Sequence, residues 1–278
     1  MNYRHAYHAG NFADVVKHLA LLAVLLHLRK KASPFAVIDS HAGRGLYDLR
    51  GEAALRTGEA AAGIGRLLQQ PAGLPPLLEY YLDVVRAAGD GRYPGSPWLA
   101  AHLLRDSDRL IAIEKHPEEL AALADVLSVC AHTRAVAGDG YARLPGLLPP
   151  RERRGTILID PPFEKDDEFA RAAQTFAHCY SRFATGIYLL WFPLKTSAQA
   201  ESFMAEILNC GVRKALRLDI EVAGAGDGEK SRLRKAGLVI VNPPFGFDAQ
   251  MQEAGAALAD RLGPDARLSL VWLAGEGL

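Results

Sequence analysis

The chain has 278 residues, of which 49% are hydrophobic, and 32 basic residues balance 32 acidic ones. This length supports one large α/β domain or two small ones, and the neutral balance excludes a nucleic-acid partner attracted by global charge alone. Three scattered cysteines without a Cys-x-x-Cys pair argue against a disulfide framework. No signal peptide is recognisable, and the apolar run 19–26 is too short to span a bilayer, so we expect a cytoplasmic protein without a membrane partner.

Predicted strands and helices alternate through the first two thirds of the chain. Apolar residues at helical spacing predict an amphipathic helix over residues 12–30. Short apolar runs predict strands at 35–38, 109–113, 133–137, 156–159 and 187–192, with helices at 118–129 and 167–180. This alternation is typical of a mostly parallel sheet that is covered by helices on both faces.

The last third of the chain does not continue the alternation of strands and helices. Strands predicted at 216–222 and 238–241 are separated by a polar, glycine-rich stretch without a crossover helix, which favours an antiparallel pair. A helix at 247–262 and a strand at 268–273 end the chain. Residues 47–95 contain helical pieces broken by prolines, and we interpret them as a helical insertion within a single domain of residues 1–278.

Acidic residues and glycines follow three of the predicted strands. Asp39 opens a turn that contains His41 and Gly43, and glycines let a ligand approach the backbone closely, although a plain turn is the alternative. Glu114 follows the second strand, 69 positions after Gly45, and 20 positions remain when the 49 residues of the insertion are removed. That spacing is typical of an acidic residue that binds ribose hydroxyls, and a solvated strand end is the alternative.

The third strand ends in Asp139-Gly140, where a carboxylate could accept a hydrogen bond from an adenine amino group. The three strand ends would then surround one crevice at the carboxyl edge of the sheet. A dehydrogenase would bind NAD there, but the segment 43–48 lacks the last glycine of Gly-x-Gly-x-x-Gly. The missing glycine favours a cofactor without phosphates.

Asp160-Pro161-Pro162-Phe163 follows the fourth strand. Prolines fix the backbone and carry no N–H, so the Asp160 carboxylate and nearby carbonyls can accept hydrogen bonds from an amine. Phe163 could stack on a base. An exocyclic amine is a weak nucleophile, and acceptors that hold its hydrogens can direct its lone pair toward a methyl donor.

A second copy, Asn242-Pro243-Pro244-Phe245, also follows a predicted strand and matches an amino-methyltransferase motif equally well. Its strand belongs to the predicted antiparallel pair, which would direct this copy away from the crevice. We therefore interpret it as a structural strand terminator.

Five blocks of the sequence match a known family, and they occur in order along essentially the whole chain. The most specific is the N-terminal block 3–18, and the others are 39–43, 93–97, 114–117 and 182–186. On these blocks the chain resembles the RlmJ family of bacterial methyltransferases, which act on N6 of an adenine in 23S ribosomal RNA. The family usually has tyrosine where this chain has Phe163, which removes a hydroxyl and puts the importance of that hydroxyl in doubt.

The resemblance implies a Rossmann-like class I fold, S-adenosylmethionine as cofactor, and protein-free 23S ribosomal RNA or an early assembly intermediate as partner of a monomer. It implies that Asp160 accepts from the target amine, with Pro161 and Phe163 beside it, and that Tyr3 and His5 reach the substrate. The implied cofactor residues, together with those from the strand ends, are Lys17, His18, Asp39, His41, Gly43, Ser96, Glu114, Asp139, Gly140 and Asp160.

Other functions remain open at this point. A DNA adenine methyltransferase or a protein glutamine methyltransferase would use a similar motif, and a catalytically silent RNA-binding module is the alternative outside the enzymes. The histidines near the N-terminus have no carboxylate or cysteine at zinc-ligand spacing, so we expect no metal site. Basic clusters occur at 29–31, 151–154 and 230–235, and such charge runs are usually solvated surface. We expect that one or both of the last two clusters contact RNA phosphates.

Overall fold

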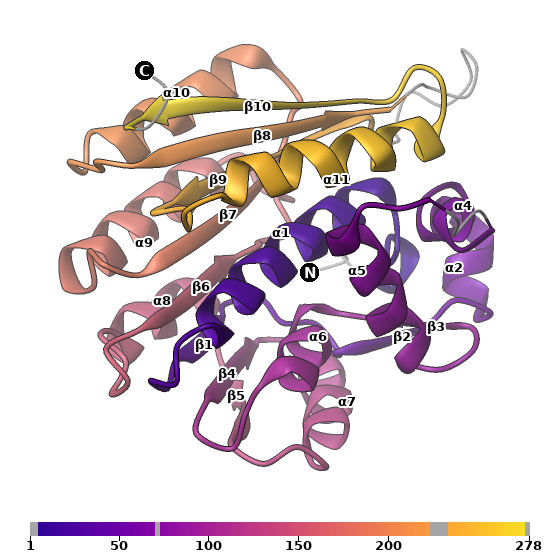
Figure 1. Ribbon diagram of the computed structural model, residues 1–278. Coiled ribbons are helices and arrows are strands. Elements are labelled where there is room, and N and C mark those ends of the chain that lie inside the picture. The colour runs from indigo at the N-terminus through magenta and orange to yellow at the C-terminus, as the bar shows by residue number, and fades with distance from the viewer. Residues whose placement is uncertain (1–4, 70–72, 223–232, 276–278) are drawn as a thin grey trace.

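The computed structural model describes residues 5–69, 73–222 and 233–275, and its centre is one eight-stranded sheet (Figure 1). The strands are β1 (Ala36–Asp39), β4 (Arg109–Glu114), β5 (Thr133–Ala137), β6 (Gly155–Ile159), β7 (Ile187–Pro193), β8 (Ala215–Glu221), β9 (Lys235–Val241) and β10 (Arg267–Ala274). They follow the order β10-β8-β9-β7-β6-β1-β4-β5.

Strand direction divides the sheet into two parts. The five strands β5, β4, β1, β6 and β7 are parallel. By contrast, β9 is antiparallel to β7 and β8, and β10 is antiparallel to β8. The predicted mostly parallel sheet with antiparallel C-terminal strands is therefore confirmed. As a consequence, β9 and β10 end at the edge of the sheet opposite to the carboxyl ends of the other strands.

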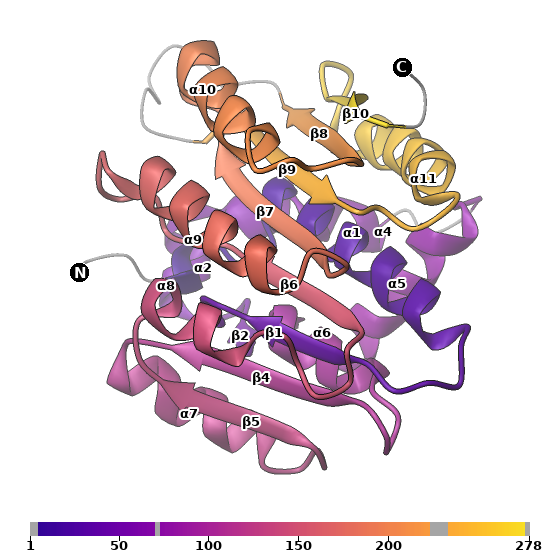
Figure 2. The same cartoon turned by 90° about the vertical axis from the view of Figure 1, so that its left-hand side faces the viewer.

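Helices cover both faces of the sheet, as Figure 2 shows. One face carries α1 (Phe12–Arg29), α6 (Ser96–Leu103), α7 (Pro117–Leu127) and α11 (Phe247–Leu262). The other face carries α8 (Gly140–Arg143), the 3-10 turn Leu144–Leu147, α9 (Glu168–Arg182) and α10 (Ser197–Leu208). The sequence did not predict α6, α8 or α10. In the described part of the chain no helix is long and apolar enough to cross a membrane.

Helix α1 is almost entirely buried. Asn11 caps its start by accepting a hydrogen bond from the backbone N–H of Asp14 at 2.9 Å. Every residue from Phe12 to Leu25 is buried, because α5 (Pro76–Ala87), α6 and α11 pack around it. The predicted helix is confirmed, but its polar residues do not form a solvated face. Its polar residues Asp14, Lys17 and His18 are buried and line a cleft instead.

The insertion has a short two-stranded base that the sequence did not predict. Strands β2 (Leu46–Asp48) and β3 (Arg92–Pro94) pair antiparallel, and three residues are too few to leave a period-two pattern. The backbone N–H of Gly95 donates to the carbonyl of Gly45 at 2.8 Å. The chain thus returns to its starting point, which explains why the insertion can be subtracted from the spacing before Glu114. The remaining insertion helices are α2 (Glu52–Thr57), α3 (Glu59–Ala62) and α4 (Ile64–Gln69).

Candidate active site

A cleft of about 1670 Å³ lies along the carboxyl edge of the parallel strands. Its lining includes twelve of the residues that the sequence and the resemblance indicated. They are His5, Lys17, His18, His41, Gly43, Ser96, Glu114, Asp139, Gly140, Asp160, Pro161 and Phe163. Two predicted residues are not part of this lining: Asp39 lies beneath the surface, and Tyr3 lies outside the described residues.

Asp39 is a buried carboxylate under the glycine turn, with 1% of its surface exposed. It accepts hydrogen bonds from Ser96 Oγ at 2.6 Å and from the backbone N–H of His41 at 3.2 Å. Burial raises the pKa of Asp39 to about 6, with the charge of Asp160 adding to the effect and the Ser96 bond opposing it. Asp39 therefore fixes two lining residues in place and does not itself face the cleft.

Glu114 joins the glycine turn to the end of β4. One of its carboxylate oxygens accepts from the backbone N–H of Gly43 at 2.8 Å, and the other accepts from that of His116 at 2.7 Å. Each oxygen keeps a lone pair, because a carboxylate has about four acceptor positions. The side chain is thus held in one orientation and can still accept hydrogen bonds from a ligand.

Two glycines allow the backbone segments around the cleft to approach one another. Gly43 has a φ of +61°, and a Cβ there would lie 2.2 Å from the hydroxyl of Tyr47. A Cβ on Gly140 would lie 2.0 Å from the carbonyl oxygen of Ser40. The start of α8 therefore contacts the glycine turn directly, and a side chain at either position would force the walls of the cleft apart.

Asp139 caps α8 at the third strand end. It accepts from the backbone N–H of Tyr141 at 3.0 Å and binds Lys115 Nζ at 3.0 Å. Arg171 of α9 lies 3.4 Å from the same carboxylate and stacks over the Tyr141 ring at 4.3 Å. Burial would raise the pKa of Asp139, but the bond and charge of Lys115 and the charge of Arg171 lower it. The sequence indicated neither Tyr141 nor Arg171. Tyr141 is two residues from Asp139 in the chain, but Arg171 reaches Asp139 and the Tyr141 ring only through the packing of α9 against α8.

The residues that line the cleft offer hydrogen-bonding groups that suit a cofactor containing adenosine. Two strand-end carboxylates, Glu114 and Asp139, supply acceptors for ribose and adenine hydrogens. The buried hydroxyl of Tyr141 has no hydrogen-bond partner within the described residues, although it lies in the cleft wall. Buried polar groups without partners are rare, so this hydroxyl marks a position where a polar ligand atom would be stabilised.

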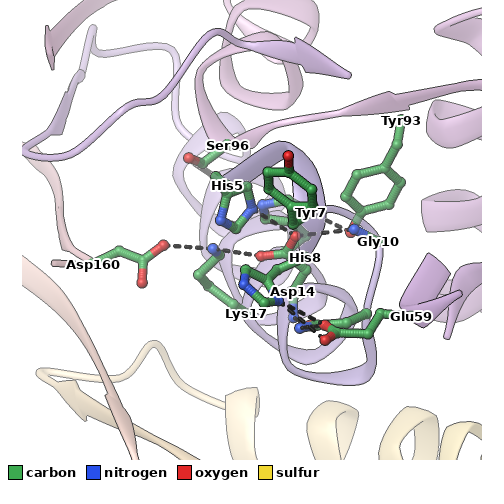
Figure 3. Close-up of polar contacts among 12 residues, drawn as sticks. His5, Tyr7, His8, Gly10, Asp14, Lys17, Glu59, Tyr93, Ser96 and Asp160 are labelled. Carbon is green, nitrogen blue, oxygen red and sulfur yellow. Dashed lines mark hydrogen bonds and ion pairs between the residues drawn. The ribbon is translucent and has the colours of Figure 1, made fainter. Parts of the chain in front are cut away.

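A chain of hydrogen bonds and ion pairs connects the N-terminal segment to Asp160 (Figure 3). Lys17 Nζ lies 2.5 Å from Asp160 Oδ2 and 2.8 Å from Asp14 Oδ1. Asp14 Oδ2 in turn lies 2.8 Å from His5 Nε2 and accepts from the backbone N–H of Gly10 at 3.0 Å. Asp160 is thereby held at one carboxylate oxygen by Lys17, which leaves the other oxygen for a substrate.

The charges in this chain stabilise one another against burial. Burial alone would lower the pKa of Lys17, but the carboxylates of Asp14 and Asp160 raise it. Likewise, burial would raise the pKa of Asp14, but the positive charges of His5 and Lys17 hold it well below its ordinary value. Asp14 was missed by the sequence reasoning. The available signal was its position three residues before Lys17, which puts both on one face of the helix.

His18 has a different environment from Lys17 although the two are adjacent in the chain. Its ring lies 2.9 Å from the hydroxyl of Tyr93, which lies 2.9 Å from that of Tyr81. Burial lowers the pKa of His18 to about 3, and the charge of Lys17 adds to this. His18 is therefore a neutral hydrogen-bonding residue of the cleft wall at physiological pH.

Phe163 lies against the core at the end of the motif. It has 4% of its surface exposed and a φ of +49°, and its ring packs against Phe169 and Trp191 with centroid distances of 4.7 and 5.7 Å. Lys195 Nζ donates to the Phe163 carbonyl at 3.3 Å. Only a small part of the ring faces the cleft, so any stacking on a base has to use that part.

The second motif lies at the opposite edge of the sheet, as expected from strand direction. It follows β9, which is antiparallel to β7, and none of its four residues lines the cleft. The Asn242 side chain donates to the carbonyls of Ala184 and Gly186, both at 2.8 Å. Its interpretation as a structural strand terminator is confirmed by these contacts.

Comparisons with known proteins agree on one family. The family model described as "Ribosomal RNA large subunit methyltransferase D, RlmJ" matches residues 32–274. The chain is 39% identical over 268 residues to ribosomal RNA large subunit methyltransferase J of Escherichia coli (strain K12). It is 35% identical over 270 residues to the protein of the same name from Haemophilus influenzae. Each alignment covers 95% of both proteins.

The fold agrees with the sequence comparison. A crystal structure of a protein from Legionella pneumophila superposes with a TM-score of 0.88 and 31% identity, over 98% of this chain and all of the other. The match to a methyltransferase family supports S-adenosylmethionine as the cofactor. On the family match, the two curated relatives and the whole-chain structural agreement, the chain belongs to the RlmJ family of ribosomal RNA large subunit methyltransferases.

Proposed function

We propose that this protein transfers a methyl group from S-adenosylmethionine to N6 of an adenine in 23S ribosomal RNA, acting as a monomer in the cytoplasm. The observation that supports this most is the position of Asp160. Its carboxylate stands at the carboxyl end of β6, in the same cleft as the adenosine-binding candidates Glu114 and Asp139. The names of the curated relatives support the ribosomal RNA substrate.

The chain's own residues would act mainly by positioning the amine. S-adenosylmethionine supplies an electrophilic methyl group when it is bound. Lys17 occupies Asp160 Oδ2, so the other carboxylate oxygen can accept one N–H of the target amine. Pro161 and Pro162 cannot donate, so nearby carbonyls remain available for the second N–H. Held in this way, the amine directs its lone pair at the methyl group, and the Asp160 carboxylate is placed to receive the proton that leaves the nitrogen.

The target adenine has to leave its stack before its amine can reach Asp160. Unstacking costs a few kcal/mol and least in a loop or a free strand. This favours protein-free RNA or an early assembly intermediate as the substrate. The N-terminal segment is suited to contact the nucleotide, because His5 lies in the cleft wall and connects through Asp14 and Lys17 to Asp160.

The test is transfer of a labelled methyl group to protein-free large-subunit ribosomal RNA. Small-subunit RNA, duplex DNA and a protein extract serve as competing substrates, and an Asp160→Ala protein with verified cofactor binding serves as the inactive control. We expect label on large-subunit RNA only, and none with Asp160→Ala. Label on DNA or on protein would replace the proposed substrate. Cofactor binding without any transfer would indicate a silent binding module.

A further inference from the structure

The cleft extends past the reaction centre onto an open face of β8, β9 and β10. Along β8, the side chains of Leu218 and Ile220 are buried in the core on the α11 side. The alternating residues Arg217, Asp219 and Glu221 point to the other side, since successive residues of a strand face opposite ways. On that side they line the cleft, so this part of the sheet presents polar side chains where a core would require apolar ones.

The charges in the cleft are unevenly distributed. Around the ends of β4 and β5, the lining carries the three carboxylates Glu114, Glu119 and Asp139 against two cations, Lys115 and Arg171. From residue 194 onward, the lining carries five cations against the two carboxylates Asp219 and Glu221. The five cations are Lys195, Arg217, Arg234, Lys235 and Arg267, and we call them the outer floor. In a chain with no net charge, the outer floor is a local positive surface next to the reaction centre.

Strand register puts much of the outer floor into one row. Glu221 of β8 pairs with Lys235 of β9 and with Arg267 of β10, and directly paired residues share a face of the sheet. The backbone N–H of Leu194 donates to the Lys235 carbonyl at 3.0 Å, which brings the next residue, Lys195, to the end of the row. With strands about 4.8 Å apart, the row extends over roughly 14 Å, enough for a few successive phosphates.

Several of these cations are available to a ligand. Within the described residues, the exposed side chains of Arg234 and Arg267 have no charged partner, and Lys195 contacts only the Phe163 carbonyl. Lys235 pairs with Glu221 at 2.8 Å, but both side chains are about half exposed (49% each), and such pairs contribute little. A row with this charge is suited to phosphate groups.

We propose that the outer floor binds the sugar–phosphate backbone of the unpaired RNA strand that flanks the target adenosine. The proposal rests on the proposed function. Lys195 provides the connection, because its ammonium holds the carbonyl of Phe163, three residues after Asp160. A strand whose base enters the reaction centre would meet Lys195 first and then follow the row toward Arg267.

The basic clusters at 29–31 and 151–154 do not lie in the cleft. Residues 29–31 lie at the C-terminal end of α1, and Arg151, Arg153 and Arg154 precede β6, so both clusters lie at the amino edge of the parallel strands. Arg154 is engaged in structure there, since it donates to the carbonyls of Leu28 and Ser33. None of these residues lines the cleft. They therefore provide matched controls with the same residue types at the opposite edge.

The experiment measures binding of a short unstructured oligoribonucleotide as a function of salt concentration. Arg234→Gln/Arg267→Gln removes two arginines of the outer floor, and Arg29→Gln/Arg153→Gln removes two exposed arginines at the opposite edge. Each phosphate contact to a single strand contributes about 0.7 to the slope of log K against log salt, so the first variant should lose about 1.4. The control should keep the wild-type slope. With ribosomal RNA as substrate, KM should rise in the first variant while kcat is retained.

Equal slopes of log K against log salt in the wild type and both variants would overturn the assignment. So would a variant whose slope falls with duplex DNA but stays unchanged with RNA. Thermal unfolding of both variants checks that the fold is intact. The binding measurement needs no methyl transfer. If the wild type binds the oligoribonucleotide through these arginines but methylates no RNA, the proposed function fails while the outer floor remains an RNA-binding surface.

Discussion

The two Pro-Pro-Phe motifs of this protein have nearly the same sequence and opposite positions. Asp160-Pro161-Pro162-Phe163 follows β6 and lines the cleft, whereas Asn242-Pro243-Pro244-Phe245 follows β9 at the other edge. Their aromatic residues also differ, with 4% of Phe163 exposed and 88% of Phe245 exposed. The difference teaches that strand direction decides whether such a motif reaches the cleft. The carboxyl end of β6 lies at the cleft, whereas β9 runs in the opposite direction and has its amino end there, with Lys235 in the lining.

The largest expected effect is on the rate of methyl transfer, which Asp160→Ala should reduce strongly and Asn242→Ala should leave unchanged. Asp160→Ala should reduce methyl transfer by roughly 10²–10⁴-fold, because the amine loses the group that orients it and takes its proton. Asn242→Ala should keep the rate per folded molecule but lower the free energy of unfolding by about 2 kcal/mol. The cause is the loss of its bonds to two carbonyls. Methyl-transfer rates and denaturant unfolding of both proteins measure these effects. A slow Asn242→Ala enzyme would contradict the conclusion that only the motif at the cleft takes part in the reaction.

The phenylalanines of the two motifs should also differ in how much they contribute to the free energy of unfolding. Phe163→Ala should lower the free energy of unfolding by about 3–5 kcal/mol, because it opens a cavity beside Phe169 and Trp191. Phe245→Ala should change it by less than about 0.5 kcal/mol, because the ring is exposed. Urea unfolding with matched m-values measures both. Equal destabilisation by the two substitutions would contradict the burial of Phe163.

Two glycines near α8 test how closely the cleft walls pack. Gly140→Ala places a Cβ against the Ser40 carbonyl, where only backbone could move aside, and overpacking of this kind costs about 1–3 kcal/mol. We expect weaker binding of S-adenosylmethionine, measured by calorimetry. Gly146→Ala is the control, since a Cβ there meets nothing within 4 Å. Unchanged affinity in Gly140→Ala would mean that the contact between α8 and the glycine turn does not shape the cofactor site.

The smallest effect concerns pH and the two histidines of α1. His18 has a folded pKa of about 3, below its ordinary 6.5, so the unfolded state binds more protons and stability is lost as pH falls below 6.5. Between pH 6.5 and 5 this loss should be roughly 1–2 kcal/mol, and it should be absent in His18→Gln. His27→Gln is the comparison, because burial lowers the pKa of His27 only modestly. Thermal unfolding across this range measures both, and identical pH profiles for the wild type and His18→Gln would contradict the burial of His18.

Much of the parallel sheet and its ligand edge could be predicted from the sequence. The apolar runs that end in Asp39, Glu114, Asp139 and Asp160 gave the strand ends, and the parallel order of strands brings those ends to one edge. The antiparallel pair β8–β9 was predicted for a related reason, since the short polar connection leaves no room for a crossover helix.

The parts that could not be predicted depend on packing between distant segments. The burial of Asp14 and Lys17 follows from α5, α6 and α11 enclosing α1, which a periodicity in one segment cannot reveal. The same holds for Tyr141 and Arg171, which meet at Asp139. For Asp39, the strand-end pattern predicts an acidic residue at the ligand edge but does not show that Ser96 lies between it and the cleft.

The most direct test of the proposed reaction is the identity of the methylated nucleoside. Large-subunit ribosomal RNA would be labelled with the wild-type protein, digested to nucleosides and separated by chromatography with mass detection. The account predicts that the label is in N6-methyladenosine and that Asp160→Ala produces none. Label in a carbon-methylated adenosine, or in a nucleoside other than adenosine, would contradict an amine held by the Asp160 carboxylate.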